Sequence, residues 1–289
     1  MTKNEVATKQ TTGLSTDVMS LLEENAGLGL DTLDDGDKII AQLKIAQMMS
    51  PQLKKSDAKY IAGLSGGDMF NAATSEVYGP IANIAVLGVY KALTVWGSLE
   101  DTSTEPPLEV VLECVNPRRY AEIKSNLVKV DTMMVLDSTK KVNESFRIAA
   151  MVIRPDNTFD PVMIECAKTR FKNARQLNTL LDSARVTIGN KVIKPPACAV
   201  MITMEVVEAS KDGNSWFEFR FSRNNDHELL NGGIFNSETL GLFLGEAKLL
   251  KESLIAGDVK LSSDEEVAPV TTTESTNEVI VDGAESVFG

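Results

Sequence analysis

The sequence predicts an α+β fold: a strand-rich antiparallel sheet or barrel with two packed helices, between acidic flexible termini. Three observations predict it. Short apolar, β-branched runs recur between turn residues, two segments have the apolar spacing of helices, and no repeat of fixed period occurs. With 289 residues, of which 43% are hydrophobic and 24% charged, the chain is long enough to bury one folded core.

Acidic residues are concentrated at the two ends of the chain. Residues 1–37 contain eight acidic and two basic residues, and residues 262–289 contain seven acidic residues and no basic one. Because the formal net charge is -12, residues 38–261 carry a net charge of +1. We therefore expect an acidic, partly disordered arm at 1–37, a single α+β nucleic-acid-binding core at 38–257 and an acidic disordered tail at 258–289.

Seven runs between these ends are predicted to be strands. They are residues 81–90, 109–115, 147–153, 162–166, 186–193, 197–207 and 216–221. The clearest pairing is a hairpin that joins residues 201–207 to 216–221, because Asp212 and Gly213 between them supply the positive φ of a tight turn.

Two helices are predicted, at residues 168–184 and 237–254. In the first, Lys168, Lys172 and Arg175 fall on one face, and the apolar side chains fall on the opposite face. In the second, Asn236 or Ser237 can cap the first turn. Its apolar stripe consists of Leu240, Phe243, Leu244, Ala247, Leu250 and Leu254, so this helix should pack on the sheet.

The residues that enzymes and metal sites need are scarce. Cys114, Cys166 and Cys198 stand in apolar runs without a CxxC pair, so we expect three buried core thiols and no metal site. The single histidine, His227, lies in a polar loop segment, and the glycine-rich stretch 63–68 lacks the Lys-Ser/Thr of a phosphate-binding loop. We therefore expect a protein that is not an enzyme and has no cofactor.

No segment has the pattern of a membrane protein or of a secreted one. Apolar runs are interrupted before they reach the roughly 18–20 residues of a membrane span, and the first residues do not form a signal peptide. We expect a cytoplasmic protein that does not associate with membranes.

The strongest concentration of basic residues lies at 165–194, with seven basic residues against two acidic ones. The basic residues are Lys168, Arg170, Lys172, Arg175, Arg185, Lys191 and Lys194. Such a segment is typical either of an ordinary solvated helix surface or of a surface that contacts the phosphates of a nucleic acid.

The strand at 216–221 alternates aromatic and polar side chains. Phe217, Phe219 and Phe221 share one face, which we expect to be core, and this leaves Trp216 and Arg220 exposed on the other. An indole and a guanidinium can both stack on unpaired bases, although an ordinary cross-strand pair is the alternative. A second basic and aromatic cluster follows Asn116-Pro117, in a turn or helix start, and consists of Arg118, Arg119 and Tyr120.

Several short segments, in the order in which they follow one another, carry a resemblance to a known group of proteins. They are Leu43-Lys44-Ile45, Ser50-Pro51-Gln52, Tyr60-Ile61-Ala62-Gly63, Gly67-Asp68-Met69-Phe70-Asn71, Glu76-Val77-Tyr78-Gly79, Arg175-Gln176-Leu177-Asn178-Thr179-Leu180 and Ser215-Trp216-Phe217. This order resembles a group of phage-encoded single-stranded DNA-binding proteins of replication or early transcription. The resemblance implies an oligonucleotide-binding (OB-like) barrel that coats unpaired DNA in the cytoplasm of an infected bacterial host cell.

The end of the chain is similar to the acidic tails of replication single-strand binding proteins. This similarity implies that Asp282, Glu285 and Phe288 recruit a partner, such as a phage polymerase or a replication protein. An acidic tail would also compete with DNA for a basic groove and so inhibit the protein's own weak binding.

Single-stranded DNA binding during replication, recombination or transcription is thus the leading expectation. One alternative is a phage transcription accessory that recruits a polymerase to opened promoter DNA, and the other is a virion or internal structural protein. The sequence leaves open whether the chain forms a homo-oligomer and whether the basic helix and Trp216 share one surface.

Overall fold

The computed structural model describes residues 39–97, 107–188, 190–224, 230–231, 234–256 and 260–261. The predictions for the arm at 1–37, for His227 and for Asp282, Glu285 and Phe288 lie outside these residues. No helix in the described part is long and apolar enough to cross a membrane.

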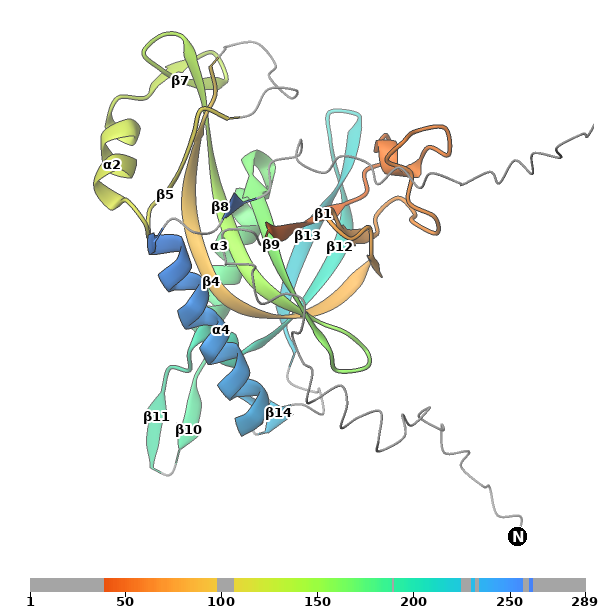
Figure 1. Ribbon diagram of the computed structural model, residues 1–289, viewed down its shortest axis with the longest axis vertical. Coiled ribbons are helices and arrows are strands. Elements are labelled where there is room, and N and C mark those ends of the chain that lie inside the picture. Colours follow the sequence, from red (N-terminus) through yellow and green to blue (C-terminus); the bar gives the residue numbers. More distant parts are fainter. Residues whose placement is uncertain are drawn as a thin grey trace, which may run out of the picture.

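Most strands belong to one curled sheet (Figure 1), which has twelve strands among the described residues. Its main path runs β13-β12-β4-β8-β9-β1-β2-β3, with β5 beside β4, β7 beside β8, β6 beside β7 and β16 beside β1. The strands of this sheet are β1 (Ile39–Ile45), β2 (Met69–Asn71), β3 (Val77–Gly79), β4 (Ile81–Val95), β5 (Glu109–Leu112), β6 (Val128–Val130), β7 (Met133–Leu136), β8 (Lys140–Ile153), β9 (Phe159–Ala167), β12 (Met201–Lys211), β13 (Asn214–Arg223) and β16 (Lys260–Leu261).

The pairing is antiparallel except where β1 runs parallel to β9 and to β16. The predicted α+β class with a strand-rich, mainly antiparallel sheet is therefore confirmed, and the half-barrel curl is consistent with an OB-like arrangement. Lys260 and Leu261, which our domain division places in the tail, form β16 beside Ile39 and Ile40.

The curl of the sheet has a local cause in β4. The register between β4 and β8 shifts between Val86 and Gly88, which marks a β-bulge that bends the strand. A Cβ atom at position 88 would lie 2.2 Å from the hydroxyl oxygen of Tyr90, so any other residue there would displace the Tyr90 side chain.

The predicted hairpin is confirmed. β12 and β13 pair from Ile202 and Arg223 to Lys211 and Asn214, and the connecting Asp212 and Gly213 both have positive φ, at 52° and 81°. Phe219 and Phe221 are almost completely buried, and the partly buried Phe217 packs against the same cluster. The prediction that the phenylalanine face of this strand is core is thus correct.

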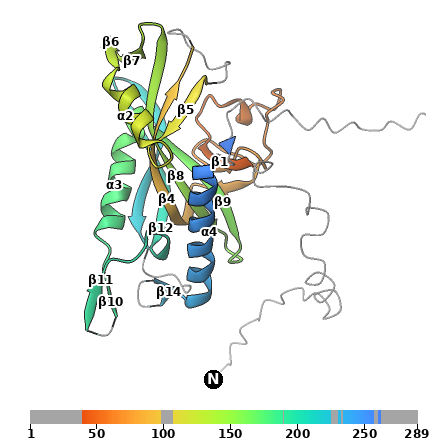
Figure 2. The same cartoon turned by 60° about the vertical axis from the view of Figure 1, so that its left-hand side comes forward.

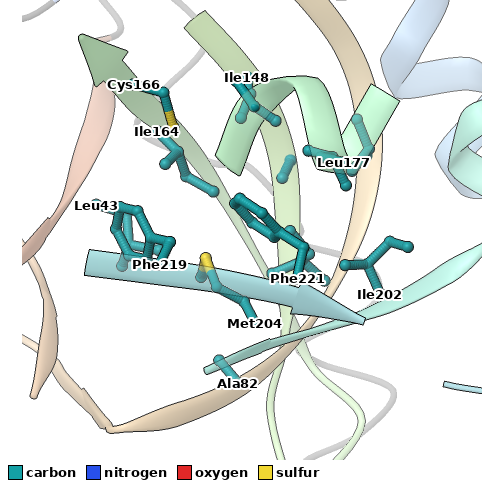
Figure 3. Close-up of a cluster of buried hydrophobic side chains, with 14 of the residues drawn as sticks. Leu43, Ala82, Ile148, Ile164, Cys166, Leu177, Ile202, Met204, Phe219 and Phe221 are labelled. Atoms are coloured by element: carbon teal, nitrogen blue, oxygen red, sulfur yellow. The ribbon is translucent and has the colours of Figure 1, made fainter. Parts of the chain in front are cut away.

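The main core lies between the curled sheet and α3 (Phe171–Asp182), as Figure 3 shows. Leu177 of α3 is fully buried beside Ile148, Ile164, Phe219 and Phe221. α3 follows the 3₁₀ turn η3 (Lys168–Arg170), so the helix predicted at 168–184 is confirmed.

A second helix, α4 (Ser237–Ala256), covers the other face of the sheet (Figure 2). Ile84 of β4 lies in the cluster with α3, whereas the next residue, Ala85, packs with Phe243 of α4. Adjacent strand residues point to opposite faces, so the two helices sandwich the sheet. Asn236 caps α4, because its Oδ1 accepts a hydrogen bond from the Thr239 amide at 2.9 Å.

The structure also contains elements that the sequence analysis did not predict as such. Residues 117–125 form α2 (Pro117–Ser125), which starts with Asn116 as a cap and Pro117 at its first position. The run 186–193, predicted as one strand, is a hairpin of β10 (Val186–Ile188) and β11 (Lys191–Ile193), since Asn190 lies in a turn before β11. A shorter pair joins β14 (Leu230–Asn231) to β15 (Ile234–Phe235), and two further 3₁₀ turns are η2 (Pro51–Leu53) and η4 (Ala197–Ala199).

One cysteine is not where we expected it. Cys166 and Cys198 are buried, as predicted, and burial raises the pKa of the Cys166 thiol to about 12. Cys114 is exposed, so its assignment to the core is wrong. It lies in the turn two residues after Leu112, the last residue of β5, and this turn carries its side chain out of the apolar run.

The edge strand β13 is held to the segment after β1 by one side chain. Oε1 of Gln47 accepts a hydrogen bond from the Phe217 amide at 2.8 Å, and Nε2 of Gln47 donates to the Phe217 carbonyl at 3.0 Å. The amide of this side chain therefore occupies the place of a neighbouring strand and brings the two sides of the curled sheet together.

A polar cluster fixes β3 to the β8–β9 turn. Arg154 pairs with both Asp160 and Glu76, and the Tyr78 hydroxyl donates to Oδ2 of Asp160 at 3.1 Å. Burial raises the pKa of the Tyr78 hydroxyl from its ordinary value of 10 to about 12.

We expect Tyr78 to ionise near pH 12 in the folded protein. Its pKa is higher in the folded chain than in the unfolded one, so its contribution to the free energy of unfolding is complete below about pH 10 and is lost between pH 10 and 12. Spectrophotometric titration of the wild type against Tyr78→Phe isolates this step. A difference titration curve centred near pH 10 would contradict the burial of the hydroxyl.

Candidate nucleic-acid interface

The basic helix and the aromatic strand share one surface. Nζ of Lys172, on α3, lies 2.9 Å from Oε1 of Glu218, on β13, and Nε2 of Gln176 donates to the Phe221 carbonyl at 3.3 Å. Glu218 lies between Trp216 and Arg220 on the same face of β13. The two groups of residues that the sequence singled out separately are thus neighbours in the fold.

The exposed pair predicted on β13 is only partly exposed. The Arg220 side chain is 59% exposed and pairs across the hairpin with Glu205, at 3.6 Å between NH1 and Oε2. Trp216 is half-buried, and its Nε1 atom has no hydrogen-bond partner among the described residues. Arg220 therefore makes the cross-strand pair that we considered as the alternative, but its side chain is still exposed to solvent.

A cavity of about 290 Å³ opens where α3 meets the hairpin. Its lining residues come from α3, β12 and β13, and they are Lys172, Asn173, Gln176, Val207, Glu218, Phe219 and Arg220. This cavity lies within the shared surface, because two of the predicted contact residues, Lys172 and Arg220, form part of its wall.

Two polar side chains in the wall are buried and incompletely bonded. Glu218 is only 6% exposed and Asn173 only 5%. Lys172 compensates the charge of Glu218 through Oε1, but Oε2 of Glu218 and Nδ2 of Asn173 have no partner among the described residues. An unsatisfied buried polar atom costs about 1–3 kcal/mol, and more when it is charged. Both atoms have almost no solvent-accessible area, so this cost falls on the packed contact between α3 and β13.

The other basic residues near α3 differ in their availability. The Arg170 guanidinium lies over the Phe219 ring, with its Cζ 5.7 Å from the ring centroid. Lys168 and Arg175 are exposed and make no ion pair within the described part of the chain. These two side chains remain available for phosphate contacts beside the cavity.

The rest of the basic segment lies at the end of α3 and on the β10–β11 hairpin, which projects from the body (Figures 1 and 2). The Arg185 guanidinium donates to the carbonyls of Asp182 and Ala184, at 2.5 and 2.7 Å. Lys194 pairs with the Asp182 carboxylate and lowers its pKa. Lys191 is exposed on β11 and is the remaining cation of this hairpin without an ion pair among the described residues.

The cluster at Arg118, Arg119 and Tyr120 belongs to α2 and to a separate apolar cluster. Arg119 donates to both carboxylate oxygens of Glu109, at 3.1 and 3.0 Å, so its charge is paired. Tyr120 is buried and donates to Oε1 of Glu144 at 2.8 Å, and burial raises its pKa. Arg118 is exposed. The buried Tyr120 ring is a core residue in this structure, so we leave this cluster out of the site.

Sequence reasoning missed the polar residues of the cavity. The alternation at 216–221 puts Glu218 on the same face as Trp216 and Arg220, which we expected to be exposed, and neither Asn173 nor Gln176 was predicted as a site residue. One signal was present: an acidic residue stands between an indole and a guanidinium, opposite a helix whose exposed face is basic. Within the described part of the chain, no group of three or more His, Cys, Asp or Glu side chains could hold a metal ion.

The fold and this surface define a strand-rich α+β protein with a polar cavity between a basic helix and the hairpin β12–β13. The chain belongs to the family described as Pam3 phage gp34-like protein, whose model matches residues 9–239. The phage origin implied by the resemblance is thereby confirmed. No curated protein and no solved structure matches the chain.

Proposed function

We propose that this protein binds single-stranded DNA through the surface where α3 meets β13. One observation carries the proposal: Lys172 of the basic helix and Arg220 of the hairpin line one cavity, and Trp216 stands two residues before Glu218, which pairs with Lys172. Cations that contact the backbone next to an aromatic ring that stacks on a base are the usual combination in single-strand binding.

The charges on this surface favour a weak, salt-sensitive complex. Lys168 and Arg175 are free to approach phosphates. The pair between Arg220 and Glu205 is exposed and long, so it stabilises little, and a phosphate can replace the carboxylate at low cost. Trp216 offers a single stacking position, which gives little preference for any one base.

Fluorescence anisotropy of a labelled oligothymidine tests this proposal across a salt series, with a duplex of equal length as control. We expect the single strand to bind more tightly and its log affinity to fall with log salt at about -0.7 per phosphate contacted. Absence of binding at low salt would overturn the proposal and favour the structural virion protein considered above.

Trp216→Leu tests the stacking contact separately. We expect the affinity to fall about ten-fold, since one base–aromatic stack contributes about 1–3 kcal/mol, while the salt slope should not change. The matched control is Trp96→Leu, because Trp96 is also half-buried but follows β4 and belongs to neither α3 nor β13. Equal losses in the two variants would contradict a specific role for Trp216.

The partners proposed for the tail, a phage polymerase or replication proteins, rest on the sequence alone. The choice between replication and transcription likewise depends on which of these proteins binds the chain.

A further inference from the structure

We propose that two copies of this chain pair through the outer face of α4, with the two helices antiparallel about a two-fold axis. The partner is thus a second copy of the chain, and the contact is the helix face that points away from the sheet. This inference does not depend on the proposed DNA binding.

The outer face of α4 is apolar although it does not contact the sheet. Phe243 and Leu254 are buried on the inner face, whereas Leu242, Leu249 and Ile255 are 46%, 55% and 57% exposed. At 100° per residue, the three exposed side chains fall on the side of the helix opposite the two buried ones. A helix that is apolar on both sides is normally covered on both sides, so this face calls for a partner.

Two glycines allow a second helix to approach this face closely. Gly241 and Gly245 lie one turn apart on the outer face, between the exposed apolar side chains. Beyond the backbone of its own helix, a Cβ atom on either glycine would have no heavy atom of the described residues within 4 Å. Packing within the described chain therefore does not require glycine here, although glycine weakens the interior of a helix. Contact with another helix does favour it, because the distance between two helix axes depends on the side chains at the contact.

The order of residues along this face is self-complementary when the second helix runs in the opposite direction. With the two-fold axis between positions 248 and 249, Leu242 of one copy meets Ile255 of the other, and Gly241 meets Ala256. Apolar side chains thus face apolar side chains, and small residues face small ones. A symmetric pair requires this self-complementarity, because both copies use the same patch.

The charges on the same face complete this match. The antiparallel arrangement brings Lys248 of each copy within one helical turn of Glu252 of the other, and the symmetry makes this contact twice. Neither side chain has an ion-pair partner within the described part of the chain. A second copy therefore offers an opposite charge to both side chains, whereas a partner of a single charge sign would repel one of them.

The pairing leaves the proposed DNA surface uncovered, because α3 and α4 lie on opposite faces of the sheet (Figure 2). The 20 residues of α4 form a helix about 30 Å long. One pair of such helices buries less than the roughly 1,600 Å² of a standard interface, so we expect a dimer that dissociates on dilution.

Sedimentation velocity of the full-length protein over a dilution series, without DNA, measures this equilibrium. We expect Leu249→Gln to raise the dissociation constant of the dimer at least about ten-fold, since Leu249 lies next to the two-fold axis. The matched control is Val128→Gln, because Val128 is 62% exposed but lies on β6. It should leave the constant unchanged.

Charge reversal tests the orientation of the two helices. Lys248→Glu and Glu252→Lys should each weaken the dimer about ten-fold, because each change places like charges opposite one another twice. An equimolar mixture of the two variants should regain the wild-type constant, since the lysines of one variant then face the glutamates of the other. A charge effect confined to one helix would not be recovered by mixing.

A full-length chain that remains monomeric at about 0.1 mM overturns the pairing, and the DNA-binding proposal stands or falls separately. A dimer that Leu249→Gln leaves intact would lie on another surface and overturns it as well. Failure of the mixture to recover the dimer overturns the antiparallel arrangement on which the proposal rests.

Discussion

Replacing Gln47 by leucine lowers the free energy of unfolding by about 2–4 kcal/mol, because both backbone groups of Phe217 lose their partner at the edge of the sheet. Leucine has a similar volume, so the loss reports the two hydrogen bonds and not a cavity. The effect should be large for a glutamine near the surface, since most such substitutions change stability by less than about 0.5 kcal/mol.

Urea denaturation followed by circular dichroism measures this change. Gln52→Leu is the control, because Gln52 is also half-buried, and its backbone carbonyl accepts the bond from the Ile61 amide whatever its side chain. A loss in Gln47→Leu no greater than in the control would mean that the curled sheet does not need this contact at β13.

The triple variant Lys168→Gln, Arg175→Gln, Lys191→Gln binds single-stranded DNA about 100-fold more weakly than the wild type near 0.1 M salt. Among the described residues, these are the exposed cations of the basic segment whose side chains make neither an ion pair nor a hydrogen bond. Each phosphate that is no longer neutralised changes the salt slope by about 0.7, which near 0.1 M salt corresponds to about five-fold in affinity. Three such phosphates together account for the loss of about 100-fold in affinity, and the magnitude of the salt slope should decrease by about 2.

A second triple variant, Lys91→Gln, Lys129→Gln, Lys251→Gln, controls for net charge. These lysines are also exposed, but they lie on β4, β6 and α4. Their removal should change affinity only slightly through the general field of the protein. If both triple variants lose affinity equally, binding depends on total charge and not on the surface beside α3.

The sequence correctly predicted the elements whose conformation depends on neighbouring residues, namely the hairpin turn, the two helices and the alternating strand. The Asp212-Gly213 turn requires positive φ and has it at both residues. The apolar stripe of α3 packs into the core, whereas the stripe of α4 is buried at Phe243 and Leu254 and partly buried elsewhere. The alternation at 216–221 correctly separated Phe219 and Phe221 from the opposite face.

Features that depend on distant segments were not predictable in this way. Glu218 is buried because α3, about forty residues earlier in the chain, packs over the hairpin and supplies Lys172. The hydrogen bonds of Gln47 require the end of β1 to lie close to β13. The residue pattern of neither segment predicts that the two are close together. Tyr120 is buried because α2 folds onto β5 and β8, although its neighbours in sequence are charged.

The parallel pairing of β16 with β1 means that the described fold begins and ends at one place, since Ile39 lies beside Lys260. The segments on either side, residues 1–37 and 262–289, carry net charges of -6 and -7, and both are joined to the body there. Both acidic segments are therefore joined to a nearly neutral body at one attachment point. In the field of a polyanion the molecule should turn that point away, which orients its body toward the nucleic acid before any contact forms.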